Sequence, residues 1–447
     1  MPVITLLMKD RLQLVTLSGL LLLASCAMHT DFYREVEQGL ARRNYAVAVA
    51  ALKANEEEFG ENNTVLFNLE LGLVAHYSAQ YGESNQMFLA AEKKMEELYT
   101  KSISAEAVAL LLNDNLLPYE GEDFEKVFVN LFLALNFAQM EDIEGALVEA
   151  RKVDLKLKEY SRQYEGKNTY KQDAFIRYVM GVLYEAGGEI NDAFISYRKA
   201  YEGYKEYANV YRTSCPTFLK ADLVRTAGLL GFDDERRQFE RQFSIKYAKP
   251  KKEDGTLLMI IHSGRGPIKE QNKIRVSIPD KDAVLHSFTV AVPKFISRER
   301  AQVRYDAVIG GGGQSMRISA EVAENVTEIA KKSLDDRIAL VYLKAGGRAV
   351  LKFLAAEKAK SEWKKEGDEA GNLLKSIFID AAVDASEQAD TRSWRSLPGQ
   401  LLIVRAQLPP GTYNLQLSAQ GPSRDLLAEQ VIIAARKVKF RVITDVN

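Results

Sequence analysis

Three segments of this 447-residue chain share one spacing of small and large residues. In each segment, a second small residue follows the first by 12 positions. A packing position follows 4 residues after that, and another follows 3 residues later. The sets are Gly72, Ser84, Phe88 and Ala91; Ala134, Ala146, Ala150 and Val153; and Gly181, Ala193, Tyr197 and Ala200. Small residues let two helices cross closely, and a large residue one turn later fills the groove between them. The spacing therefore predicts stacked pairs of antiparallel helices.

This spacing resembles the tetratricopeptide repeat, whose helical hairpins stack side by side into an array. A weaker copy lies at Tyr45, Ala48 and Leu52. Val36 stands where that copy needs its first small residue. The departure suits a terminal, capping repeat.

Two polar segments, 111–123 and 161–173, interrupt the array, so we do not expect a regular superhelix. Residues 216–232 and 233–247 are predicted to form a last helical pair. We therefore expect a tetratricopeptide-like, all-α repeat domain over residues 26–247. A generic helical bundle is the alternative.

A change of hydrophobic period divides the chain after a polar linker at residues 248–256. Alternating apolar residues then predict strands at 256–264, 272–279, 286–293, 301–309, 411–420 and 437–446. Residues 320–366 have a helical pattern with a break at Gly346–Gly347, and we expect the helical insertion to cover about 320–387. The fold class is thus α+β and multidomain, with a β-rich, sandwich-like domain over residues 257–447.

The N-terminus has the pattern of a secretory signal peptide, expected at residues 1–25. Lys9 and Arg11 precede an apolar stretch at 12–24, which is too short to span a bilayer comfortably. The residues Leu23-Ala24-Ser25-Cys26 resemble a lipobox, and this resemblance implies that Cys26 carries a diacylglycerol. An ordinary cleaved signal with a chance cysteine is the alternative.

Lipid anchoring would fix the location of the protein. Each buried CH₂ contributes about 0.8 kcal/mol, so two or three acyl chains on Cys26 hold a folded domain durably at a membrane. Ala27 follows the cysteine. By resemblance to Gram-negative lipoprotein sorting, this implies the outer membrane, with the protein facing the periplasm.

Composition excludes some classes of function. The net charge is −1, from 60 basic and 61 acidic residues, which argues against nucleic acid as a partner. The second cysteine, Cys215, has no histidine close in sequence, so we interpret it as a structural thiol rather than a nucleophile.

No motif indicates catalysis, a cofactor or a metal. The histidines, His29, His76, His262 and His286, are scattered without metal-ligand spacing. Gly310–Gly313 is not followed by Lys-Ser/Thr, so it is interpreted as a hairpin loop rather than a phosphate-binding loop. We therefore expect no enzyme activity, no cofactor, no metal site and no small-molecule substrate.

The stretch Ala389–Tyr413 holds Trp394, one of two tryptophans, between Arg392 and Arg395. Aromatic and arginine residues dominate binding hot spots, so these three are the candidate interaction residues. A tryptophan packed beneath the sheet, with arginines paired to nearby acids, is the alternative.

Residues 116–153, 178–201 and 389–413 together resemble an uncharacterised family of Gram-negative tetratricopeptide-repeat lipoproteins. Genes of that family often neighbour lipoproteins similar to penicillin-binding-protein activators. The family has no established activity, and its gene neighbourhood points only to work in the envelope or cell wall. From the helical repeats we expect a scaffold or assembly factor of the cell envelope that binds a protein or peptide partner along their concave face. A peptidoglycan- or glycan-binding module or enzyme in the C-terminal half, and a purely structural lipoprotein, are the alternatives.

Overall fold

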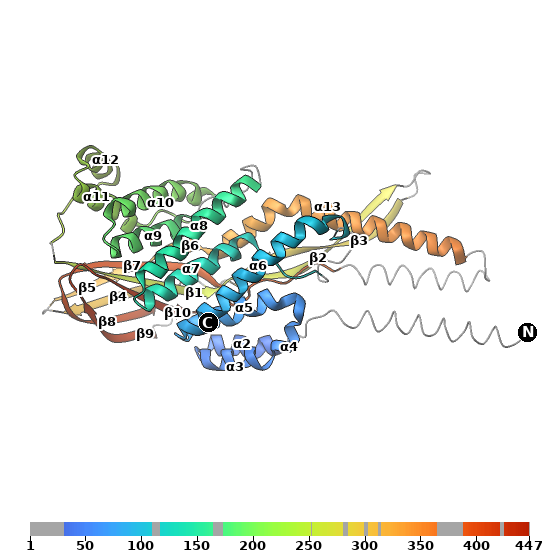
Figure 1. Ribbon diagram of the computed structural model, residues 1–447, viewed down its shortest axis with the longest axis horizontal. Coiled ribbons are helices and arrows are strands. Elements are labelled where there is room, and N and C mark those ends of the chain that lie inside the picture. Colours follow the sequence, from blue (N-terminus) through green and yellow to red (C-terminus); the bar gives the residue numbers. More distant parts are fainter. Residues whose placement is uncertain are drawn as a thin grey trace, which may run out of the picture.

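The computed structural model describes residues 31–109, 117–163, 173–251, 253–279, 285–298, 303–311, 314–363, 388–420 and 424–446. Cys26 and the expected signal peptide lie outside these ranges. The described chain is α+β, with a helical region followed by a β-rich region that holds one long helix (Figure 1). The expected order of the two halves is confirmed.

The helical region consists of five helical hairpins, counted over the described residues. They pair α2 (Asp31–Ala41) with α3 (Tyr45–Ala54), α5 (Thr64–Tyr77) with α6 (Tyr81–Ala109), α7 (Asp123–Gln139) with α8 (Ile143–Gln163), α9 (Ala174–Ala186) with α10 (Ile190–Val210), and α11 (Thr217–Leu230) with α12 (Asp233–Phe243). Short α4 (Glu56–Phe59) and the 3₁₀ turn η1 (Glu61–Asn63) join the first two hairpins. We call the first helix of each hairpin its A helix and the second its B helix.

All five hairpins use the same turn. One residue has a positive φ, and the next donates its N–H to the carbonyl five positions earlier, which satisfies the free carbonyls at the end of the A helix. The positive-φ residues are Arg43, Ala79, Glu141, Gly188 and Gly231, and the hydrogen bonds are Asn44 to Gly39, Gln80 to Ala75, Asp142 to Phe137, Glu189 to Tyr184 and Phe232 to Ala227. The five hairpins therefore share one local turn geometry.

The packing contacts predicted from the spacing are confirmed in the second and fourth hairpins. A Cβ at Gly72 would lie 2.8 Å from the Phe88 ring, and a Cβ at Gly181 would lie 2.4 Å from the Tyr197 ring. The Ser84 hydroxyl donates to the Gly72 carbonyl at 2.7 Å. Only a glycine lets the large residue of the B helix pack directly on the A-helix backbone.

The expectation that the first A helix has no small residue at its crossing is wrong. Gly39 of α2 lies against α3, where its Cβ would be 3.0 Å from the Cβ of Ala48. The prediction failed because it placed the crossing 12 residues before Ala48, whereas these two short helices cross close to their turn.

The β-rich region contains two four-stranded sheets and a two-stranded hairpin. Its strands are β1 (Gly255–Arg265), β2 (Ile268–Pro279), β3 (Leu285–Ile296), β4 (Arg304–Gly311), β5 (Gln314–Ser319), β6 (Glu321–Asn325), β7 (Pro398–Leu408), β8 (Gly411–Gln420), β9 (Arg424–Ile433) and β10 (Val438–Asp445). The central sheet has the order β10-β1-β7-β6, with β1 and β10 parallel. The outer sheet has the order β5-β4-β8-β9 and is antiparallel.

Several predicted boundaries are wrong. Strands β5, β6, β7 and β9 were not expected, and β1 begins at Gly255, inside the expected linker. The helical insertion begins at Val326 rather than about 320, because residues 321–325 pair with β7. Helix α13 (Val326–Trp363) continues through Gly346–Gly347 without a break. Residues 364–387 lie outside the described ranges.

The central sheet lies between two layers. Leu257, Met259 and Ile261 of β1 pack toward the outer sheet, and Leu258 and Ile260 pack toward the helices. Every β1 residue from Gly255 to His262 is therefore buried, as expected for a strand covered on both faces. The helical region and the central sheet share one hydrophobic core.

The hairpin β2–β3 and helix α13 extend from the body as an arm (Figure 1). Val290 and Val292 of β3 pack against Ala345 of α13 in a small core of their own. The first turns of α13 are anchored in the main core through Val326 and Ile329.

Candidate functional site

The three candidate interaction residues lie in one irregular segment, Ala389–Leu397, which we call the inner segment. It precedes β7 and contacts the A helices α5 and α7 of its own chain. A helical-repeat array commonly binds ligands along the face that its A helices line. In this protein the inner segment and the central sheet cover that face.

Trp394 is 1% exposed. Its indole lies 5.7 Å from both the Phe88 and Phe132 rings, in edge-to-face geometry. The indole Nε1 donates to Ser396 Oγ at 3.1 Å. The tryptophan is packed inside its own chain and is not a surface contact.

Two buried glutamates of the A helices bind the backbone of the inner segment. Trp394 N donates to Glu125 Oε1 at 2.8 Å. Arg395 N and Ser396 N donate to the two oxygens of Glu70, at 2.6 and 3.1 Å. Burial raises the pKa of Glu125 to about 7 and raises the pKa of Glu70, while these N–H donors act in the opposite direction.

The two arginines attach the flanks of the segment to the helices. Arg392 bonds to Asp390 and to Asn63 Oδ1, and its guanidinium lies 5.3 Å from the centre of the Tyr119 ring. Arg395 bonds to Glu37 at 3.0 Å and lies 4.4 Å from the centre of the Tyr33 ring. The three candidate residues are thus brought together, in contact with the helical region.

The sequence analysis missed Glu70 and Glu125. A signal existed for Glu70, which is an isolated acid in an apolar A helix, in NLELGLV, whereas Glu125 follows Glu122 and Asp123 and is typical of the acidic first turn of a helix. A buried carboxylate needs donors, and an extended segment that offers consecutive N–H groups supplies them.

A second buried polar cluster joins the helices to the central sheet. Arg405 of β7 lies 2.9 Å from Glu185 and 3.3 Å from Asp222, and Arg225 lies 2.7 and 2.8 Å from the same carboxylates. Burial opposes ionisation of Glu185, but Arg225 and Arg405 outweigh it and lower its pKa to about 2. Tyr197, the groove-filling residue of the fourth hairpin, donates to Glu185 at 2.6 Å.

His76 of α5 and His262 of β1 form a buried pair at the same interface, with ring centres 5.2 Å apart. The side chain of Asn136 lies 2.5 Å from His76 Nδ1. Among the described residues, His76 Nε2 and both nitrogens of His262 have no hydrogen-bond partner. Burial lowers the pKa of His76 to about 4 and lowers the pKa of His262 further below its usual value.

Other candidate chemistry is weak in the described part of the chain. The thiol of Cys215 is half-buried, and burial raises its pKa to about 12, which opposes nucleophilic reactivity. Within the described ranges, no three His, Cys, Asp or Glu side chains cluster as a metal site would require. Over those same residues, no helix combines the length and apolarity that crossing a membrane requires.

The outer face of the repeats carries a groove of about 290 Å³ between the B helices α8 and α10, with residues of α9 at its base, which we call the B-helix groove. Leu155, Met180, Tyr184 and Ile195 give it an apolar floor. Its charged rim consists of Arg151, Asp154, Lys158, Asp192 and Lys199. Asp154 is paired with Arg177 at 3.0 Å and with Lys199 at 3.9 Å, and Arg151 is paired with Glu189 at 3.9 Å, so the rim carries charges of both signs.

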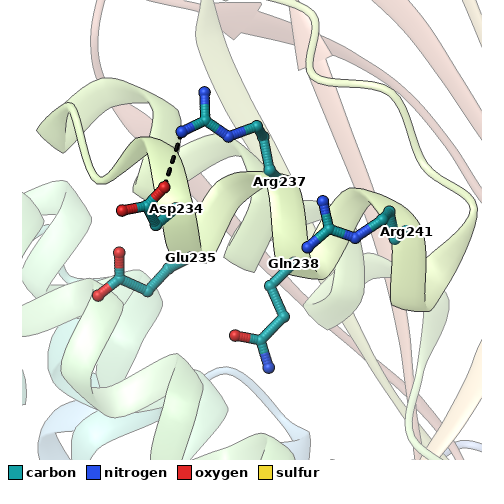
Figure 2. Close-up of a pocket in the computed structure, with 5 residues that line it drawn as sticks. All are labelled: Asp234, Glu235, Arg237, Gln238 and Arg241. Atoms are coloured by element: carbon teal, nitrogen blue, oxygen red, sulfur yellow. Dashed lines mark hydrogen bonds and ion pairs between the residues drawn. The ribbon is translucent and has the colours of Figure 1, made fainter.

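A wider, open hollow of about 610 Å³ lies along α12. Figure 2 shows that its side chains leave the helix in different directions, with Arg237 paired to Asp234 and turned away from Glu235 and Gln238. Such divergent groups do not form a binding constellation.

A scan against protein-family models finds no match to this chain, and a search of curated proteins finds none either.

Proposed function

We propose that this protein is a lipid-anchored scaffold or assembly factor of the cell envelope, held through Cys26 at the periplasmic face of the outer membrane. Its partner is an envelope protein or peptide that binds the helical repeats. Cell-wall synthesis is the process to which the resemblance to Gram-negative lipoproteins points.

One observation carries the proposal: the chain itself covers the inner face of the repeats, while their outer face stays open. Every residue of α5 from Val65 to Tyr77 is buried, between its B helix on one side and the sheet and inner segment on the other. On the outer face, Leu155 is 65% exposed and Ile195 is also exposed. A partner therefore has access to the B helices.

The B-helix groove gives the proposed partner a chemistry. An apolar floor beneath a rim of mixed charge fits an amphipathic helix or an extended peptide that carries charged residues beside its apolar ones. Tyr184 forms part of the floor, and Arg151 donates to its hydroxyl at 3.0 Å. The charged rim would orient the peptide, and the apolar floor would supply most of the affinity.

A glycan-binding module in the C-terminal half is supported less well. Exposed aromatic platforms are the usual means of holding sugar rings, and Trp394 is buried.

Crosslinking and mass spectrometry on native membranes test the proposal, comparing the wild type with Cys26→Ala. We expect Cys26→Ala to leave the membrane fraction and to lose its envelope partners. Unchanged fractionation and partners would contradict anchoring. A wild type that recovers no specific partner would favour a purely structural lipoprotein.

Two variants locate the partner site. Ile195→Asp places a charge in the apolar floor of the B-helix groove and should lower partner crosslinking severalfold. Leu89→Asp is the matched control, because Leu89 is an exposed leucine of another B helix, α6. Equal effects of both changes would exclude the groove as the specific site.

A further inference from the structure

Three arginines converge on one carboxylate where β1 ends. Arg265 is the last residue of β1, Arg298 follows β3, and Arg395 belongs to the inner segment. In that order, their guanidinium groups lie 3.8, 3.5 and 3.0 Å from the carboxylate oxygens of Glu37 on α2. The four residues belong to four separate segments of the chain, so only the tertiary fold brings them together. We call them the arginine cluster.

One carboxylate is too little for three guanidinium groups. The Arg395 contact has the length of a good hydrogen bond, the Arg298 contact is at the limit, and the Arg265 contact is beyond it. Arg265 makes no other ion pair with the described residues. Among the same residues, the buried Nε of Arg395 has no hydrogen-bond partner. Buried donors normally have an acceptor, so the cluster has donors left for a further anion.

The cluster also carries an excess of positive charge. The buried carboxyl of Glu70 acts on it as well, and burial raises the pKa of that carboxyl. Even with Glu37 and Glu70 both ionised, the three arginines leave one positive charge unbalanced among these five side chains. Burial and the neighbouring charge of Arg265 lower the pKa of Arg298 to about 10. Like charges are thus held together at a cost that a bound anion would remove.

Solvent reaches every member of the cluster. The side chains of Arg265, Arg298 and Arg395 are 20%, 16% and 26% exposed, and that of Glu37 is 34% exposed. A small anion therefore has access without unfolding of the chain. Arg298 donates to the carbonyl oxygens of Gly266 and Arg395, so its guanidinium is fixed in place before a ligand binds. Glu37, the most exposed of the four, can turn outward.

We infer that the arginine cluster binds a phosphate monoester group, free in solution or carried on a lipid headgroup. Such a group offers three terminal oxygens and about two negative charges, whereas Glu37 offers two oxygens and one charge. It therefore matches three guanidinium groups better than the carboxylate does. The phosphate takes the place of Glu37 between the arginines. The inference goes beyond the proposed function, because it involves neither Cys26 nor the B-helix groove.

Isothermal titration with inorganic phosphate measures this site in the purified full chain, held in nonionic detergent at a constant ionic strength set by chloride. We expect one phosphate to bind per chain, and acetate to bind about tenfold more weakly because it carries one charge. Arg265→Gln should weaken phosphate binding about tenfold and keep the melting temperature, since it removes only a long, partly exposed ion pair. Arg237→Gln is the matched control, because Arg237 is an exposed arginine paired with an acid on α12.

Glu37→Gln separates a binding role from a structural one. If Glu37 competes with phosphate, the neutral side chain should tighten phosphate binding severalfold. Phosphate should then raise the melting temperature of Glu37→Gln more than that of the wild type. A cluster with a purely structural role would instead lose stability on this change and gain no affinity for phosphate.

A wild type that does not bind phosphate would overturn the inference, and so would equal phosphate affinities of Arg265→Gln and Arg237→Gln. Detergent micelles that contain phosphatidic acid distinguish the two sources of the phosphate group, with phosphatidylcholine micelles as the control. Competition by phosphatidic acid in the phosphate titration would show that the cluster takes a lipid headgroup. An unchanged titration would show that it takes free phosphate.

Discussion

The two faces of the helical repeats differ in what covers them. The central sheet and the inner segment cover the A-helix face. There Glu70 and Glu125 accept hydrogen bonds from the inner segment, and the Arg405 cluster joins the sheet to the helices. The B-helix face carries exposed apolar residues and a groove. One face therefore behaves as protein core, and the other is free for recognition.

This difference changes where binding should be sought in such a fold. An open repeat array offers its A helices to an extended peptide. Here the chain supplies that extended segment itself, and two carboxylates recognise its backbone N–H groups. The repeats thus serve as a scaffold for the C-terminal half, and only their outer face remains for another molecule.

The largest expected effect contrasts Trp394 with Leu155. Trp394→Ala should lower the free energy of unfolding by about 4 kcal/mol, because it leaves a cavity between Phe88 and Phe132. Leu155→Ala, on the outer face, should change it by no more than about 0.5 kcal/mol. Urea denaturation followed by circular dichroism measures both. Similar losses for the two variants would refute the distinction between the faces.

The buried ion cluster should show the next largest effect. Arg405→Leu leaves Glu185 and Asp222 buried with one cation fewer, which should cost about 3 kcal/mol. The matched control is Lys205→Met, which removes an exposed ion pair with Glu202 and should leave the melting temperature nearly unchanged. Equal melting temperatures for Arg405→Leu and the wild type would mean that the cluster does not hold the sheet on the helices.

The histidine pair predicts a loss of stability in acid. An unfolded histidine takes up a proton near pH 6.5, whereas His76 stays neutral in the folded protein down to about pH 4. The unfolded state therefore binds more protons between these values, and stability falls as the pH falls through them. Each such imidazole costs about 1.4 kcal/mol per pH unit in that window.

His262→Phe isolates this contribution. The change removes two ring nitrogens that have no partner, so it should stabilise the protein by about 1 kcal/mol at pH 7 and reduce the slope below pH 6.5. Thermal melts of both proteins from pH 7.5 to pH 5 provide the measurement. Because raised carboxyl pKa values, such as that of Glu125, act in the opposite direction, only the difference between the two proteins is diagnostic. Parallel pH profiles would contradict the assignment.

The sequence predicts local packing in this protein better than it predicts long-range pairing. The spacing from Gly181 to Tyr197 fixes a contact because both residues lie in one hairpin. The order of the two halves follows from the change in hydrophobic period. The sequence does not predict strand β6, whose five residues are EVAEN. They form a strand because they pair with β7, which lies far away in the sequence.

The candidate site was predictable only in part. Arg392, Trp394 and Arg395 were found by composition, but their environment depends on Glu70 and Glu125, more than 250 residues earlier in the chain. No periodicity links residues so far apart. An acid in an apolar helix can be recognised as needing a donor, yet the sequence does not show which segment provides it.

Two helical glycines test the same division between closed and open surfaces. Gly181→Ala forces a methyl group into the Tyr197 ring and should destabilise the protein by about 2 kcal/mol. Gly346→Ala places its methyl group where no described atom lies within 4 Å, so it should stabilise the protein by about 1 kcal/mol through helix propensity. Opposite shifts in melting temperature are therefore expected from the same chemical change. If Gly346→Ala also destabilised the protein, α13 would have a neighbour within the chain at that position.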